Sequence, residues 1–202
     1  MTTRIPCRTC GDLIHPDTAA KSNGLCMPCK GGYRESIEEG KRQRERERAY
    51  EKSPERRHWL ALVERVHKSN EGFYSLSPDE QTYFALRCLI GEVFNGGFHQ
   101  FFANHSGEYY GFAVNGLLEL EAMRSHQLLT RAKEVLFGDQ AVPTGFAERN
   151  QLLRMVEEDD ITYSAVGKRL DELENQFWAE PDELSNRCSR FAIDRGLYAS
   201  DA

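Results

Sequence analysis

Hydrophobic residues recur at helical spacing through most of the chain beyond Ser53. Ser53-Pro54-Glu55 supplies an N-cap residue and a first-turn proline, and apolar residues from Trp59 to Val66 follow at intervals of three and four. Further stretches with this spacing cover roughly 109–123, 126–137, 146–157, 164–178 and 182–194. Because no stretch sustains an alternation of β-branched and polar residues, the pattern predicts a mainly α, bundle-like domain over residues 58–202.

The clearest predicted helix start lies at Ser77-Pro78-Asp79-Glu80, which has the sequence of a capping box with proline at the first helical position. Apolar residues continue from Tyr83 to Phe94. Asn95-Gly96-Gly97 should then stop the helix, because glycine adopts positive φ angles without strain. We expect a short aromatic element at 98–102 to pack back on this helix.

The first 57 residues differ in composition from the rest. Residues 1–33 are rich in Cys, Gly and Pro and hold few large apolar residues. Because the segment is also short, it cannot bury a hydrophobic core of its own. Residues 34–57 contain strong helix formers without an apolar stripe, which is typical of a solvated helix between domains. We therefore predict a small metal-binding module at 1–33, a charged helical spacer at 34–57 and an all-α domain at 58–202.

Four cysteines in the first module have the spacing of a zinc site. Cys7 and Cys10 form one C-x2-C pair, Cys26 and Cys29 form a second, and fifteen residues separate the two pairs. Two residues between cysteines allow both thiolates of a turn to reach one tetrahedral ion. Since all four ligand positions are cysteine, no place is left for water or substrate. The sequence therefore predicts a structural Zn²⁺ in a zinc-ribbon-like knuckle.

The net charge of −6 is unevenly distributed along the chain. Residues 58–202 hold 23 acidic and 13 basic residues, a net charge of −10, whereas residues 1–34 carry +3. An acidic body repels the phosphates of nucleic acid and of membranes, which disfavours direct binding to either. The sequence has no apolar run of about 20 residues and no signal-peptide pattern at its start, so we expect a cytoplasmic protein.

Two segments of the body resemble a known family. The first is Gly91-Glu92-Val93-Phe94-Asn95-Gly96-Gly97-Phe98-His99-Gln100-Phe101-Phe102-Ala103-Asn104-His105-Ser106-Gly107, and the second is Leu170-Asp171-Glu172-Leu173-Glu174-Asn175-Gln176-Phe177-Trp178. Together they resemble the signatures of the bacterial DNA-mimic (DMP-type) protein family, whose helical domain has an Asn-Gly-Gly-Phe turn, an aromatic pair and a small polar turn. The resemblance covers about 58–197. The residues of the first segment themselves fit either a corner of a helical bundle or a binding surface.

This resemblance implies a noncatalytic protein whose acidic surface imitates DNA phosphates and occupies a DNA-binding protein, such as a regulator. The domain type is also associated with toxin-immunity proteins, for which the partner is a toxin. The sequence leaves a homodimer open. The candidate partner-binding acids are Glu157, Glu158, Asp159, Asp160, Asp171, Glu172, Glu174, Glu180, Asp182 and Glu183.

A metal-dependent enzyme is the remaining alternative. His99, His105 and Glu108 could converge near the Asn-Gly-Gly-Phe turn and bind a metal or transfer protons. However, the chain has no phosphate-binding Gly-rich loop ending in Lys-Ser/Thr, no G-x-S-x-G sequence and no H-E-x-x-H sequence. We therefore expect no catalytic residues, and we expect Cys88 and Cys188 to be unreactive core or surface thiols.

Overall fold

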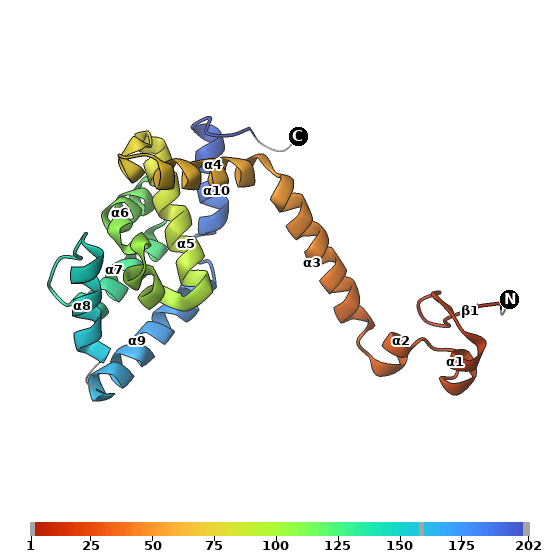
Figure 1. The fold of residues 1–202 in the computed structure, drawn as a ribbon. Helices are drawn as coiled ribbons and strands as arrows, with labels where there is room; N and C mark the ends of the chain where they lie inside the picture. The colour runs from red at the N-terminus through yellow and green to blue at the C-terminus, as the bar shows by residue number, and fades with distance from the viewer. Residues whose placement is uncertain (1–2, 158–159, 200–202) are drawn as a thin grey trace. The chain divides into compact units, whose positions relative to one another are not determined.

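The computed structural model describes residues 3–157 and 160–199, and for residues 155–157 and 160–164 it describes the backbone alone. The chain divides into two compact units, residues 1–53 and residues 54–202, which Figure 1 colours from red to blue along the chain. Among the described residues no helix is long and apolar enough to cross a membrane.

Over residues 3–53, the described part of the first unit, the chain forms two very short strands and three helices. Strand β1 (Ile5–Pro6) pairs antiparallel with β2 (Leu13–Ile14), and Ile5 lies opposite Ile14. Helices α1 (Pro16–Lys21) and α2 (Met27–Gly31) follow, and neither buries a residue. This unit therefore has almost no apolar core, which agrees with its composition.

Helix α3 (Arg34–Lys52) is the charged helix expected from the sequence, and none of its residues is buried. Its charges pair along the exposed surface. Arg42 and Arg46 both contact the Glu39 carboxylate, at 2.8 and 2.7 Å, and Lys41 lies 3.0 Å from Glu38. Exposed pairs of this kind stabilise a helix by only a few tenths of a kcal/mol each. The helix therefore depends on its residue propensities and these pairs rather than on packing.

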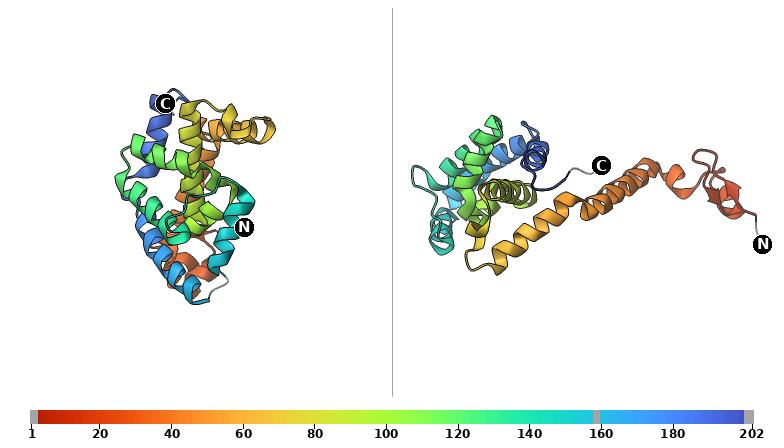
Figure 2. Two further views of the ribbon diagram at one scale, coloured as in Figure 1. Left: turned by 90° about the vertical axis from the view of Figure 1, so that its left-hand side faces the viewer. Right: turned by 90° about the horizontal axis from the view of Figure 1, so that it is seen from above.

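The second unit is all-α in its described part, which confirms the predicted fold class. Helix α5 runs through its middle, and helices α6, α9 and α10 pack against it (Figures 1 and 2). The elements are α4 (Pro54–Lys68), η1 (Gly72–Ser75), α5 (Pro78–Ala103), η2 (His105–Tyr109), α6 (Tyr110–Glu119), α7 (Met123–Phe137), α8 (Phe146–Glu157), α9 (Asp160–Trp178) and α10 (Leu184–Asp194).

Helix α5 begins with the predicted capping box. The Ser77 side chain accepts a hydrogen bond from the Glu80 backbone N–H, and Glu80 accepts one from the Ser77 backbone N–H at 2.8 Å. The helix then buries Tyr83, Leu86 and Val93 completely. Burial of such side chains stabilises the fold by about 1.5–3 kcal/mol each. Helix α5 is therefore the central element of the hydrophobic core.

The predicted break in α5 lies at Gly96 and Gly97. Gly96 has φ −158° and ψ 22°, Gly97 has φ 81° and ψ −178°, and helical geometry resumes after them up to Ala103. The second half of α5 buries Phe98, Phe101 and other aromatic residues in the same core. The break thus redirects the chain so that both halves of α5 contribute to one core.

Candidate functional site

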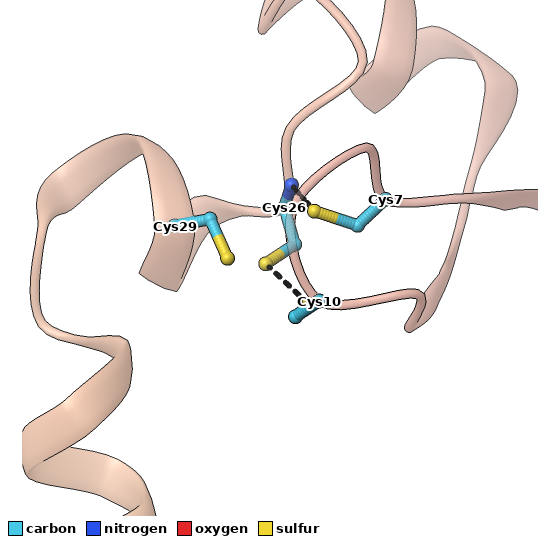
Figure 3. A group of neighbouring side chains, drawn as sticks. All are labelled: Cys7, Cys10, Cys26 and Cys29. Carbon is cyan, nitrogen blue, oxygen red and sulfur yellow. Dashed lines mark hydrogen bonds between the residues drawn. The ribbon is translucent and has the colours of Figure 1, made fainter.

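The four N-terminal cysteines lie together in the first unit. Cys7 follows β1, Cys10 lies in the next turn, Cys26 is the N-cap of α2 and Cys29 lies within α2. Their sulfur atoms all lie within 4.8 Å of one another, and the side chains converge on one point (Figure 3). Among the described residues this is the only group of three or more His, Cys, Asp or Glu side chains with ligand atoms this close.

The electrostatics of the cysteine cluster suit a cation. The backbone N–H groups of Cys10 and Cys26 point at the Cys7 sulfur, with Cys26 N at 3.2 Å, and they lower the pKa of that thiol to about 6. The neighbouring Cys26 thiol, together with burial, raises the pKa of Cys29 to about 12. One thiolate therefore forms readily, whereas the last thiol ionises only if a positive charge compensates the others.

Backbone and side-chain contacts hold the cysteine turn against α3. The Cys7 N–H donates to the Asp12 carbonyl at 2.8 Å, and Gly11, with φ 77°, donates to the Cys7 carbonyl at 2.9 Å. The Asp12 carboxylate pairs with Arg34 in the first turn of α3, and this contact lowers the pKa of Asp12. The cluster and the start of α3 thus form one connected structure.

The two signature segments meet in space at Gly97. The Glu174 Oε1 atom accepts a hydrogen bond from the Phe98 backbone N–H at 2.8 Å, across 76 residues of sequence. A Cβ atom on Gly97 would lie 2.1 Å from that oxygen, and φ at Gly97 is 81°. Glycine is required there both for its backbone conformation and because it lets the carboxylate reach the freed N–H. Burial raises the pKa of Glu174.

The aromatic residues of the two segments also contact one another. The Phe177 ring lies 5.3 Å from Phe98 and 6.0 Å from Phe94, between ring centroids, and both arrangements are T-shaped. The Trp178 Nε1–H donates to the Val93 carbonyl at 3.0 Å, next to the break in α5. The signature residues therefore join α5 to α9, and their first role is structural.

A buried arginine, which the sequence pattern alone does not reveal, holds the next corner. Arg149 in α8 is fully buried and donates to the carbonyls of Phe102 and Asn104, at 2.6 and 2.8 Å. Its Nη1 atom also donates to the carbonyls of Pro143 and Thr144. Burial lowers the pKa of this guanidinium.

The positions of Arg149 in α8 and of Gly107 both fit this corner. Arg149 lies four residues before Leu153, which is buried, so the arginine occupies the apolar face of α8. A Cβ atom on Gly107 would lie 2.6 Å from the Arg149 Nε atom and 2.7 Å from the Phe102 carbonyl oxygen. Gly107 of the first signature segment is therefore needed to admit the arginine.

Several polar residues of the first signature segment converge on Glu92. The side-chain amides of Gln100 and Asn104 donate to its Oε2 atom, at 2.6 and 2.9 Å. The Ser106 Oγ atom lies 3.3 Å from Oε1. These contacts fix the Glu92 carboxylate beside the turn that leads from α5 into η2.

The predicted acidic surface is only partly exposed in the described residues. Asp171 and Glu172 on α9 and Glu183 before α10 are exposed. Glu174 is only 8% exposed and caps the second half of α5, so its assignment to an exposed surface is wrong. A charged residue on an amphipathic helix is expected to be solvated. The burial of Glu174 is explained only by its hydrogen bond with the distant Phe98 N–H.

The remaining acids of that set divide into two kinds. Glu180 accepts a hydrogen bond from the Ser185 N–H and so fixes a local turn. Asp182 instead accepts one from the Ser125 N–H at 2.7 Å, in the first turn of α7, 57 residues earlier in the chain. Glu158 and Asp159 lie outside the described residues. For Glu157 and Asp160 the structure describes the backbone and not the side chain.

The histidine alternative is not supported by the geometry. His99, His105 and Glu108 do not form a group of three ligands within 4.8 Å in the described part of the chain. The His105 ring instead stacks on Phe146, with 4.5 Å between centroids and 17° between planes. These three side chains therefore do not form the metal-binding group that the enzyme alternative requires.

The surroundings of the two cysteines of the body disfavour the thiolate form. Cys188 is fully buried and Cys88 packs against the core. Burial raises the pKa of both thiols to about 12, so both remain protonated near neutral pH. Neither thiol is suited to act as a nucleophile.

The fold and these contacts define an all-helical domain organised around a broken central helix, with a four-cysteine module ahead of it. A family model described as DMP19-like protein matches residues 74–195, which include both signature segments. The chain belongs to this family. The matched region excludes the cysteine module, α3 and α4. No curated protein and no solved structure matched the chain significantly.

Proposed function

We propose that this chain is a noncatalytic protein that binds another protein, and that it sequesters a DNA-binding protein by presenting carboxylates in place of DNA phosphates. Membership of the DMP19-like family carries this proposal, since DNA mimicry is the role that the signature segments imply. The excess of acidic residues in the body supports it, because a surface of this sign attracts the cationic face of a DNA-binding protein.

Of the acids whose side chains the structure describes, we assign the exposed ones to the partner-binding surface. Asp171 and Glu172 are adjacent on α9, and Glu183 precedes α10. Duplex DNA carries about one negative charge per 1.7 Å of its axis, so a mimic needs carboxylates close together on one face. The acids at 157–160 stay part of the proposed surface, whereas Glu174 is removed from it.

For the cysteine cluster we propose a structural Zn²⁺ held by Cys7, Cys10, Cys26 and Cys29. Four thiolates are the donor set that zinc accepts in structural sites, and two of the four cysteines are buried. Bound zinc would supply a cross-link in place of a hydrophobic core. A cytoplasmic location, where cysteines stay reduced, fits this chemistry.

Capture of the partner tests the proposed function. The tagged full-length protein is incubated with lysate of its source organism, and retained proteins are identified by mass spectrometry. The wild type should retain a DNA-binding protein, and Asp171→Lys with Glu172→Lys should retain much less of it.

Asp139→Lys is the matched control, since Asp139 is an exposed acid outside the proposed surface, in the loop after α7. Equal retention by the wild type and the double variant would contradict an acidic binding surface. A secreted toxin as the retained protein would contradict DNA mimicry and favour an immunity role.

A further inference from the structure

A pocket of about 520 Å³ lies in the second unit between α4, the first half of α5 and η2. Its floor is apolar and is formed by Val66, Phe84, Cys88 and Tyr109. The raised pKa of Cys88, caused by burial, keeps that thiol neutral. Pockets that hold small ligands measure about 300–1,000 Å³, so this pocket can accept a long side chain with part of its backbone.

The polar lining of the pocket carries negative charge and no basic side chain. Glu92 and Glu108 both line it, and no lining residue is a lysine or arginine. Within the described part of the chain, neither carboxylate lies in a salt bridge with a lysine or arginine, although the buried Arg149 guanidinium attracts Glu108 over a longer distance. Glu92 is held in position by Gln100 and Asn104, so one carboxylate is oriented before any ligand arrives.

The two histidines of the lining, His67 and His105, add ring nitrogens that can form hydrogen bonds. His67 Nδ1 lies 2.8 Å from the Val63 carbonyl, which can only accept, so Nδ1 carries a proton. His105, which stacks on Phe146, lines the same pocket.

We propose that this pocket binds an arginine side chain of the partner protein. A guanidinium can form paired hydrogen bonds with a carboxylate and can lie on an apolar, aromatic surface, whereas an ammonium is a strongly hydrated point charge. Phosphates and other anions are disfavoured by Glu92 and Glu108. The proposal rests on the proposed protein-binding function and adds a specific contact to it. This contact involves residues 104–107, which end the first signature segment, and Glu108, which follows them.

An NMR titration of the full-length ¹⁵N-labelled protein tests this pocket without the partner. The probe is the blocked tripeptide acetyl-Gly-Arg-Gly-amide, and its neutral control has citrulline in place of arginine. The arginine peptide should cause saturable shifts in the amide signals of residues 104–109, with a Kd of about 1–10 mM. The citrulline peptide, which has nearly the same shape without the charge, should cause none.

Glu108→Gln should weaken binding of the arginine peptide by about fivefold, since it removes one of the two charges. Glu134→Gln, on a separate surface groove, is the matched control and should leave the Kd unchanged. Equal binding of the citrulline peptide, absence of shifts in residues 104–109, or an unchanged Kd in Glu108→Gln would each overturn the proposal. Equal binding of a lysine peptide would overturn the assignment to arginine.

This result is separable from the test of the proposed function. If the peptide does not bind but the partner is still captured, the pocket proposal fails alone. If the peptide binds and no protein partner is captured, the proposed function fails and the pocket still binds a guanidinium.

Discussion

At the scale of single residues, two glycines of the first signature segment each leave space for a polar side chain. A larger residue at either position would collide with that side chain. Gly97 makes room for the Glu174 carboxylate, and Gly107 makes room for the Arg149 guanidinium. Both partners come from distant helices, α9 and α8. The Asn-Gly-Gly turn could be predicted from the sequence, but the groups that occupy the space beside each glycine could not, since they depend on tertiary packing.

Gly97→Ala should lower the free energy of unfolding of the helical domain by about 2 kcal/mol or more, because alanine is strained at φ 81° and its Cβ would displace Glu174. Gly91→Ala is the control, since Gly91 is in the same helix with a helical φ and no atom lies within 4 Å of the position that its Cβ would take. It should be neutral or stabilising by up to about 1 kcal/mol. Urea denaturation followed by circular dichroism measures both, and equal stability of the two variants would contradict the role of Gly97.

Arg149→Met should destabilise the domain by about 3 kcal/mol, because buried carbonyls of the corner between α5 and α8 lose their donor. The exposed Arg154 in the same helix provides the comparison. Arg154→Met should change the free energy of unfolding by less than about 0.5 kcal/mol. Thermal unfolding of both variants distinguishes them, and a small effect at both positions would show that the corner does not depend on the arginine.

At the scale of elements, the sequence predicted the start and the break of α5 because both depend on local chemistry. The capping box needs only Ser77 and Glu80, and the break needs only the two adjacent glycines. The contact between α9 and α5 could not be predicted in this way. Glu174 follows Leu173 in an amphipathic helix, and nothing near it in sequence shows that its carboxylate caps a half-helix elsewhere.

The raised pKa of Glu174 predicts a pH dependence of this contact. Between the unfolded pKa of about 4.3 and the higher folded value, the folded state binds more protons than the unfolded state, so stability falls as pH rises through that window. Glu174→Gln keeps an oxygen that can accept from Phe98 but has no charge to bury. Its free energy of unfolding relative to the wild type should therefore be higher at pH 7 than at pH 4. A difference that is constant with pH, or that has the opposite sign, would contradict the assignment.

At the scale of the whole molecule, the two units depend on different forces. Residues 1–53 have almost no apolar core, whereas the helical domain has a continuous one. The four-cysteine spacing could be found from the sequence because metal ligands follow a short, regular pattern. The exposed part of the acidic surface could not be found from the sequence, because the number of acidic residues does not show which carboxylates are buried.

The protein purified without added metal should contain one zinc ion per chain by elemental analysis, and Cys26→Ser should abolish it. Cys88→Ser, in the helical domain, should retain it. Because zinc binding is coupled to folding of its site, a chelator should unfold the first module while most of the helical circular dichroism signal remains. Stoichiometric zinc in Cys26→Ser would contradict the assigned ligands.

The central claim is that carboxylates of the helical domain occupy the DNA-binding face of a partner. Its most direct test is a competition titration of the identified partner, its DNA site and this protein at two salt concentrations. The account predicts that this protein displaces the DNA, that its affinity falls steeply as salt rises, and that Asp171→Lys with Glu172→Lys displaces it poorly. A ternary complex, in which the partner binds DNA and this protein at the same time, would contradict the account.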